Sequence, residues 1–185
     1  MKRDPDSIRP DIVHQSLLNL LDSPLNKMGL LEVYIRTINN HLIKINKITK
    51  LPRTFKRFCG LFTQLLLKNE IKTEDGETLL KILDNKTAEL FDGKTPKILI
   101  DKNARLVDLD LYLNSLCNNK RFSNQYCFIV PCNKWYNISR GVNKTALNFD
   151  SSLVNDSISI SSFDLETNII SSKICNSFEK LNKII

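Results

Sequence analysis

Two arginine-bearing helix starts constrain the fold of this chain most. The first lies at Arg9 and Pro10, and proline suits the first position of a helix, expected over residues 10–21 with apolar side chains at helical spacing. The second lies at Arg53 or the next residue, Thr54, and begins a helix with a broad apolar face that ends near residue 68. Both helices therefore begin beside a cation and need a core on one side.

The rest of the chain alternates strand and helix signals. Strands are expected at residues 30–36, 41–46, 98–100 and 125–130. Further helices are expected at residues 77–84, at 106–117 and at about 165–183. Turns are expected at residues 22–26 and 69–76, and a loop with one weak strand at 132–157. The first two strands flank an Asn-Asn pair typical of a β-hairpin, and the later alternation predicts an α/β sheet with parallel strands.

Length and composition predict one domain over residues 1–185. The chain has 185 residues, of which 42% are apolar, enough for one good core. No run approaches the roughly 18 apolar residues of a membrane span, and the first residues form no apolar signal core, so we expect a soluble chain with no membrane partner. The five cysteines form no C-x-x-C pair, which predicts reduced thiols and no metal site.

The net charge of +7 is compatible with an RNA partner without proving one. Lysine, asparagine and isoleucine are abundant while alanine is scarce, so nucleotide bias can account for much of the lysine. Arginine carries the argument better, because its planar fork holds phosphate with two hydrogen bonds. The positions of the arginines therefore matter more than the total charge.

Four cations gather around the two helix starts: Arg9, Lys50, Arg53 and Arg57. One interpretation is that they are ordinary surface cations. The other is an anion site, since helix amides and arginines together suit an RNA backbone. Cations near a helix N-terminus oppose the helix dipole, and a bound anion would explain why the chain has them at two helix starts.

Asp11 and His14 are three residues apart on the first helix and so share a face. The structural interpretation is that Asp11 caps the helix and pairs with an arginine while His14 packs against the core. The catalytic interpretation makes Asp11 accept or orient a proton of a target base. A carboxylate held by arginine would have a lowered pKa and be a weak base, so positioning is the better role.

Two segments in the second half of the chain are a predicted strand end and a serine-rich loop, and neither by itself identifies a cofactor. They are Phe128–Cys132, which ends a strand, and the serine-rich Ser157–Ser161. The chain has neither a G-x-G-x-x-G nor a G-K-[ST] loop, which argues against dinucleotide and P-loop chemistry. Trp135 and Tyr136 could stack on a base or be structural.

Three segments resemble a family of ribosomal RNA methyltransferases that methylate pseudouridine at ring nitrogen N1 in small-subunit rRNA. They are Arg-Pro-Asp-Ile-Val-His-Gln at 9–15, Leu-Asp-Ser-Pro-Leu-Asn-Lys at 21–27 and Pro-Arg-Thr-Phe-Lys-Arg-Phe-Cys-Gly-Leu at 52–61. The resemblance implies that Asp11, as the catalytic residue, and Arg9 form the target-base and RNA site. It implies RNA contacts by Arg53, by Arg57 and by Lys50, where the family usually has arginine.

The segment from Ser159 to Lys173 is similar to the part of that family that threads a knot and contacts S-adenosylmethionine (SAM). The resemblance implies these cofactor-binding residues: Val130, Pro131, Cys132, Ile158, Ser159, Ile160, Phe163 and Leu165. The chain has Pro131–Tyr136 where the family has a Gly-Ala-x-x-x-Gly loop, and proline removes an amide donor. The resemblance also implies an N-terminally short copy, because the family has a strand before the Arg-Asp-Pro that resembles residues 3–5.

The resemblance implies a SPOUT-like α/β fold with a mostly parallel sheet, a C-terminal trefoil knot and a β-hairpin insertion. It implies a homodimer that uses SAM to methylate small-subunit rRNA in the nucleus or nucleolus, together with other ribosome assembly factors. A non-catalytic rRNA-binding assembly factor with a degenerate SAM site is the alternative. A module that recognises an RNA stem-loop by shape is the third possibility.

Overall fold

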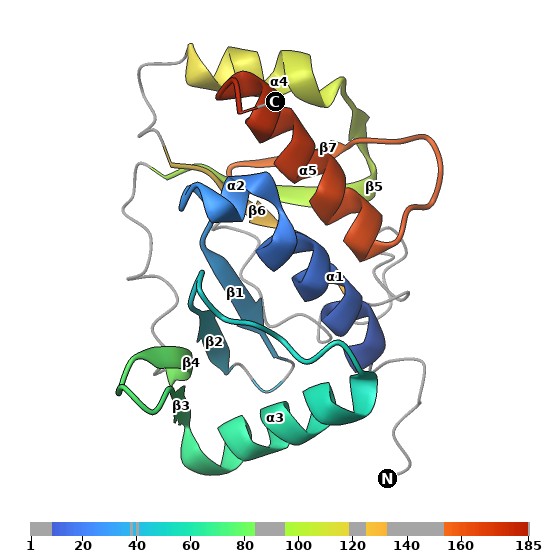
Figure 1. Ribbon diagram of the computed structural model, residues 1–185. Helices are drawn as coiled ribbons and strands as arrows, with labels where there is room; N and C mark the ends of the chain where they lie inside the picture. Colours follow the sequence, from blue (N-terminus) through green and yellow to red (C-terminus); the bar gives the residue numbers. More distant parts are fainter. Residues whose placement is uncertain are drawn as a thin grey trace, which may run out of the picture.

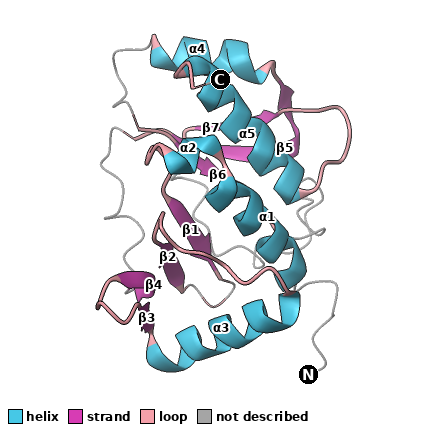
Figure 2. Cartoon of the chain, in the orientation of Figure 1, coloured by secondary structure: helices cyan, strands magenta, loops and turns pink. Residues whose placement is uncertain are grey.

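The computed structural model describes residues 9–37, 39, 41–83, 95–118, 125–132 and 154–184 (Figures 1 and 2). Its elements are, in chain order, α1 (Pro10–Asp22), α2 (Pro24–Lys27), β1 (Val33–Arg36), β2 (Leu42–Ile45), α3 (Phe55–Lys68), β3 (Glu70–Lys72), β4 (Thr78–Leu83), β5 (Lys97–Leu106), α4 (Leu109–Cys117), β6 (Cys127–Ile129), β7 (Asp156–Ser159) and α5 (Thr167–Leu181). The strands form two sheets, one antiparallel and one parallel.

The first sheet is antiparallel, with strand order β1-β2-β4-β3. Alternation along the strands places Ile43 and Leu80 on one face, where each is about 2% exposed or less. Helices α1 and α3 supply the other side of this core, including Leu17 at 2%, Phe58 at 2% and Leu65 at 0% exposure. The first half of the chain thus closes its own core between two helices and a sheet.

The second sheet is parallel, with strand order β6-β5-β7. Its buried Ile98 and Ile158, each 0% exposed, pack with Ile174 of α5, and residues of α4 add to this cluster. Figure 1 shows α5 lying across this sheet and beside α1. The α1–α5 contact joins the two halves, and one of its links is a 3.3 Å hydrogen bond from Asn19 to Ser172.

Most expected elements of the described residues are confirmed. Both arginine-bearing helices form, and the hairpin forms as β1 and β2. The strand expected at 98–100 forms as the longer β5, and the strand expected at 125–130 forms as the shorter β6. The α/β class with a parallel sheet is confirmed as well. The hairpin is larger than expected, because β4 and β3 extend it into a four-stranded sheet.

The helix expected at 77–84 is wrong, because residues 78–83 form strand β4. Its Leu and Lys residues have good helix propensity, but β4 pairs with β2 on one side and β3 on the other, and Leu80 is buried at 1% exposure. Tertiary pairing and burial outweigh a weak local preference here. The turn expected at 69–76 is wrong at its start for the same reason, since residues 70–72 form β3.

Three other boundaries differ. The helix expected from residue 106 begins at Leu109, because β5 continues to Leu106 and the Asp108 carboxylate caps the helix by accepting a 3.0 Å hydrogen bond from the Leu111 N–H. The turn at 22–26 contains the short helix α2, capped by Ser23. Of the expected loop at 132–157, residues 133–153 lie outside the described residues, and β7 occupies its end.

Within the described part of the chain, no helix has both the length and the apolar character needed to cross a membrane. The same residues contain no group of three or more His, Cys, Asp or Glu side chains arranged to hold a metal ion.

Candidate functional site

The start of α1 carries a two-pronged ion pair. Arg9 is the N-cap residue, and its Nε and Nη2 atoms donate to the two carboxylate oxygens of Asp11 at 2.9 and 2.6 Å. The Arg9 side chain is 25% exposed and that of Asp11 48% exposed, so the pair lies at the surface. Asp11 therefore pairs with arginine as expected, but the N-cap position belongs to Arg9, and no side chain caps this helix.

The hydrogen bonds from Arg9 hold the pKa of the Asp11 carboxyl below its ordinary value, against a smaller opposing effect of desolvation. Asp11 is therefore ionised at neutral pH and accepts hydrogen bonds without taking up a proton readily. A carboxylate of this kind is suited to orienting a ligand that donates an N–H group.

His14 fixes the start of α1 against the start of α3. Its side chain is 1% exposed, its Nε2 atom lies 2.8 Å from the Pro52 carbonyl oxygen, and its ring stacks on Phe58 at a centroid distance of 4.4 Å. The structural interpretation of His14 is thus confirmed. Because this contact spans both helix starts, it determines how the Arg9–Asp11 pair lies relative to Arg53 and Arg57.

The start of α3 carries the other expected cations. Arg53 donates from Nη2 to the Asp22 carboxylate at 2.6 Å, with 72% of its own side chain exposed. Lys50 and Arg57 are exposed. Thr54 occupies the N-cap position of α3 without a side-chain hydrogen bond to the helix. Arg53 is thus positioned by the end of α1, while Lys50 and Arg57 face solvent.

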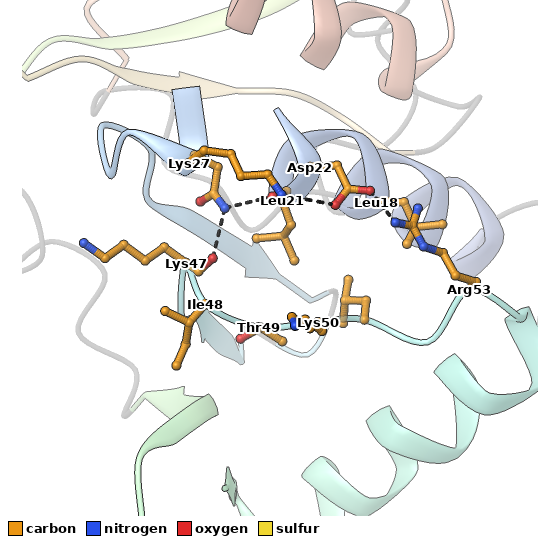
Figure 3. Close-up of a pocket in the computed structure, with 11 residues that line it drawn as sticks. Leu18, Leu21, Asp22, Lys27, Lys47, Ile48, Thr49, Lys50 and Arg53 are labelled. Carbon is orange, nitrogen blue, oxygen red and sulfur yellow. Dashed lines mark hydrogen bonds and ion pairs between the residues drawn. The ribbon is translucent and has the colours of Figure 1, made fainter. Parts of the chain in front are cut away.

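A cavity of about 560 Å³ lies between the end of α1, α2 and the segment that leads to α3. Figure 3 shows the Asp22 carboxylate at its edge, with Arg53 reaching it from one side and Lys27 from the other, at 3.9 Å. The lining residues are Leu18, Leu21, Asp22, Asn26, Lys27, Lys47, Ile48, Thr49, Lys50, Leu51 and Arg53. Four cations and one carboxylate give this cavity an excess of positive charge.

A buried amide joins the walls of the cavity. Asn26 is 4% exposed, and its Nδ2 donates to the carbonyl oxygens of Leu21 and Lys47, both at 2.9 Å. Its Oδ1 is buried without a hydrogen-bond donor among the described residues. The two bonds link the last turn of α1 to the segment that carries Lys47 and Lys50.

The expected cofactor residues lie at the ends of β6 and β7 and before α5. The Thr167 hydroxyl, at the start of α5, donates to the Pro131 carbonyl at 2.6 Å and so ties the end of β6 to this helix. Val130 lies beyond Ile129, the last residue of β6 that pairs with β5, so the ladder does not use its backbone polar groups. Burial raises the pKa of the Cys132 thiol, which is therefore protonated at neutral pH.

The residues expected at the end of β7 divide into buried and exposed positions. Ile158 is 0% exposed and pairs with β5, so its side chain belongs to the core. Ser159 is 3% exposed, and its hydroxyl donates to the Ser161 carbonyl at 2.9 Å. Phe163 is 77% exposed, while Ile160 and Leu165 are half-buried. Trp135 and Tyr136 lie outside the described residues.

Sequence reasoning missed several residues of this region. Asp22 had a detectable signal, because it lies in the 21–27 segment, but pairing with Arg53 across 31 positions has no local pattern. Lys27 and Lys47 could not be distinguished from the many other lysines of the chain. Thr167 gave no signal, since its role depends on the packing of α5 against the end of β6.

A family model described as EMG1/NEP1 methyltransferase matches residues 1–179. A relative from Candida albicans named ribosomal RNA small subunit methyltransferase NEP1 is 38% identical over 97% of this chain and 62% of its own length. The protein of that name from Drosophila melanogaster is 36% identical over 97% of this chain and 68% of its own length. The chain thus spans less than two thirds of the length of the first relative and about two thirds of the length of the second.

The fold is similar to a solved structure from Archaeoglobus fulgidus, Nep1 bound to S-adenosylhomocysteine. The two chains share 25% sequence identity, and the TM-score is 0.71 over 95% of this chain and 72% of the other. The similarity therefore extends through both sheets and the helices that cover them.

Proposed function

The chain belongs to the EMG1/NEP1 methyltransferase family, and we propose that it transfers a methyl group from SAM to ring nitrogen N1 of a pseudouridine in small-subunit rRNA. The observation that carries this proposal is the match of the family model to residues 1–179, supported by relatives named ribosomal RNA small subunit methyltransferase. The cation-rich surface at the starts of α1 and α3 supports an RNA substrate, because a nucleic acid backbone is bound largely by Arg and Lys.

In this proposal, the Arg9–Asp11 pair orients the target base. The carboxylate accepts a hydrogen bond from the base, and its lowered pKa makes it an acceptor rather than the general base. The N1 proton leaves to water. A base inside a helical stem would have to be flipped out to reach such a site, and Arg53, Arg57 and Lys50 would hold the flanking backbone.

When bound, SAM supplies a sulfonium-activated methyl group that is open to in-line attack. The residues proposed to hold it are Val130, Pro131, Cys132, Ile158, Ser159, Ile160, Phe163 and Leu165. They fit in two respects. The N–H groups of Val130 and Cys132, beyond the last paired residue of β6, can donate hydrogen bonds, although the carbonyls of Val130 and Pro131 already accept them from Cys132 and Thr167. The exposed Phe163 ring offers an apolar surface for an adenine. The bond from Thr167 to Pro131 would keep this segment in place.

The finer features of the family are also proposed for this chain. They are a single SPOUT-like domain over residues 1–185 with a C-terminal trefoil knot, and a homodimer. We also propose that the protein acts on rRNA in the nucleus or nucleolus, together with other ribosome assembly factors. Two observations support the SPOUT assignment: the parallel sheet β6-β5-β7 covered by α5, and the similarity of the A. fulgidus structure over 95% of this chain.

A second function is favoured by one observation. Pro131 has no backbone N–H and its carbonyl is already bonded to Thr167, so two backbone groups expected near a cofactor are not available to it. A chain with such a site could serve as a non-catalytic rRNA-binding assembly factor. The missing donor costs about 1–3 kcal/mol, which weakens a site without abolishing it.

The test is methyl transfer from labelled SAM to a small-subunit rRNA hairpin that carries pseudouridine at one position. The control is the same hairpin with uridine, whose N1 is bonded to the ribose and therefore cannot be methylated. We expect label in the pseudouridine hairpin alone. Label in both hairpins would contradict the N1 assignment, and label in neither, with RNA still bound, would favour the assembly factor.

A further inference from the structure

The cavity beside α2 carries cations that the proposed reaction does not require. Lys27 and Lys47 line it together with Lys50 and Arg53, and Asp22 is the one carboxylate among its lining residues. Figure 3 shows the Lys47 side chain extending away from Arg53, with Lys27 and Asp22 between them. The cations therefore follow one another across the cavity and do not converge on a single point.

The cavity has a fixed frame. Asn26 bridges the Leu21 and Lys47 carbonyls from a buried position, and the Asn26 N–H donates to the Ser23 hydroxyl at 3.2 Å. The helix α2 that carries Lys27 is further held by the Glu179 carboxylate of α5, which accepts a 3.0 Å hydrogen bond from the Leu25 N–H. A frame held at several points lowers the cost of ordering the cations when a ligand binds.

The distance between Asp11 and the cavity sets a minimum length for a ligand that reaches both. Asp11 and Asp22 lie at opposite ends of α1, and a rise of 1.5 Å per residue separates them by about 16 Å along the helix axis. One nucleotide placed at Asp11 cannot also fill the cavity. A ligand that reaches both must be longer than one nucleotide, and the cations of the cavity, including Arg53 paired to Asp22, suit one with repeated negative charges.

We propose that the cavity binds backbone phosphates of the RNA strand that flanks the target nucleotide, with Lys27 and Lys47 as the contacts. This inference rests on the proposed function, since it takes RNA as the substrate. Lysine is a flexible point charge that suits phosphate and reads no sequence, so the cavity sets the register of the RNA. The exposed Ile48 side chain, 45% exposed, adds apolar surface beside the lysines.

The experiment compares the double variant Lys27→Gln/Lys47→Gln with Lys27→Arg/Lys47→Arg, which keeps the charges. The control for lost charge is Lys68→Gln/Lys173→Gln, two exposed helix lysines outside the cavity. Affinity is measured over a range of salt for two probes: an rRNA hairpin with its flanking stem, and the minimal loop around the target. Thermal melting checks that every variant folds.

For the long hairpin, the Gln variant is expected to bind about tenfold or more weakly and to lose about 1–2 units of salt slope. The Arg variant and the control should bind like the parent chain, and affinity for the minimal loop should not change. Equal affinity of parent and Gln variant for the long hairpin, or an equal loss in the control, would overturn the proposal.

Two arms separate this inference from the proposed function. Methyl transfer to the minimal loop should be the same in the parent chain and the Gln variant. If neither transfers a methyl group, only the proposed methyltransferase activity is contradicted, because the comparison of RNA affinities needs no turnover. Inorganic phosphate, added without RNA, probes for a small-anion site. If it raises the melting temperature of the parent chain but not of the Gln variant, while RNA affinity is equal, the cavity is not an RNA contact.

Discussion

At the residue scale, each arginine that opens a helix has a carboxylate partner of its own. Arg9 pairs with Asp11 within the same helix start, and Arg53 pairs with Asp22 at the far end of α1. The first pair could be predicted from spacing, while the second depends on how α3 approaches α1. These partners reduce the conflict between the cations and the helix dipoles, so the helix starts do not require a bound anion to explain them.

The Asp11→Asn variant is expected to lose a small amount of stability, under about 1 kcal/mol, because both members of the pair are exposed to solvent. The pKa of Asp11 is lowered in the folded protein from its ordinary value of 3.8, so its ion pair stabilises the fold above that pH and ceases to do so as the pH falls through the lowered pKa. Urea unfolding at pH 7 and near pH 3 measures this.

Asp11→Asn should lower the rate of methyl transfer far more than its small loss of stability can explain, since an amide does not replace the charged carboxylate that holds Arg9 and orients the base. If the difference in unfolding free energy between the parent chain and Asp11→Asn is the same near pH 3 as at pH 7, the lowered pKa of Asp11 is contradicted.

The double variant Arg53→Ala/Arg57→Ala is expected to bind an rRNA hairpin more weakly and to reduce the salt slope by about 1–2 units, because two phosphate contacts are lost. Lys68→Ala is the matched control, a cation in the last turn of the same helix. Fluorescence anisotropy over a salt series gives both quantities. An unchanged slope with folded protein would remove these arginines from the RNA site.

At the element scale, local patterns predicted the helices and the β1–β2 hairpin of the first half, but not β3 and β4, which extend that hairpin into a sheet. The apolar spacing of α1 and α3 is strong, and their amphipathic faces pack where expected. Strand β4 has helix-forming residues, and only its pairing with β2 and β3 makes it a strand. The β3–β4 connection was nonetheless signalled by Gly76, which has φ +85°, a conformation that other residues rarely adopt.

Two glycines give opposite predictions. A Cβ at either Gly76 or Gly60 would meet nothing within 4 Å, so only the backbone matters. Gly76→Ala should destabilise the fold by about 1–2 kcal/mol because of its positive φ. Gly60→Ala, in the exposed middle of α3, should stabilise the fold by about 0.5–1 kcal/mol through helix propensity. Denaturant unfolding tests both, and two changes of the same sign would refute the β3–β4 turn or the helix.

The contact between α5 and α2 depends on Glu179, a carboxylate with 5% exposure. Glu179→Ala should cost about 1–3 kcal/mol, because the Leu25 N–H is left buried without an acceptor. Glu179→Gln keeps an acceptor of the same shape and should cost clearly less. Chemical denaturation of the two variants decides this, and equal losses would mean that the hydrogen bond is not what stabilises the contact.

At the scale of the whole molecule, two cores are joined by contacts between residues far apart in the chain. The sequence predicted an α/β fold with parallel strands, and the resemblance predicted the family, as the match over residues 1–179 confirms. The pairing of α1 with α5 and the cavity beside α2 could not be predicted, because Asn19–Ser172 and Leu25–Glu179 contacts leave no periodic signal. Local patterns encode faces, and only packing decides which faces meet.

Calorimetric titration with SAM and with its demethylated product decides whether this chain is a SAM-dependent enzyme. We expect at least one of them to bind in the micromolar range, more weakly than at a site with every backbone donor, because Pro131 lacks an N–H. Thr167→Val, which removes the bond to Pro131, should weaken that binding further. No heat of binding at millimolar ligand, with rRNA binding intact, would contradict the enzyme and leave an assembly factor.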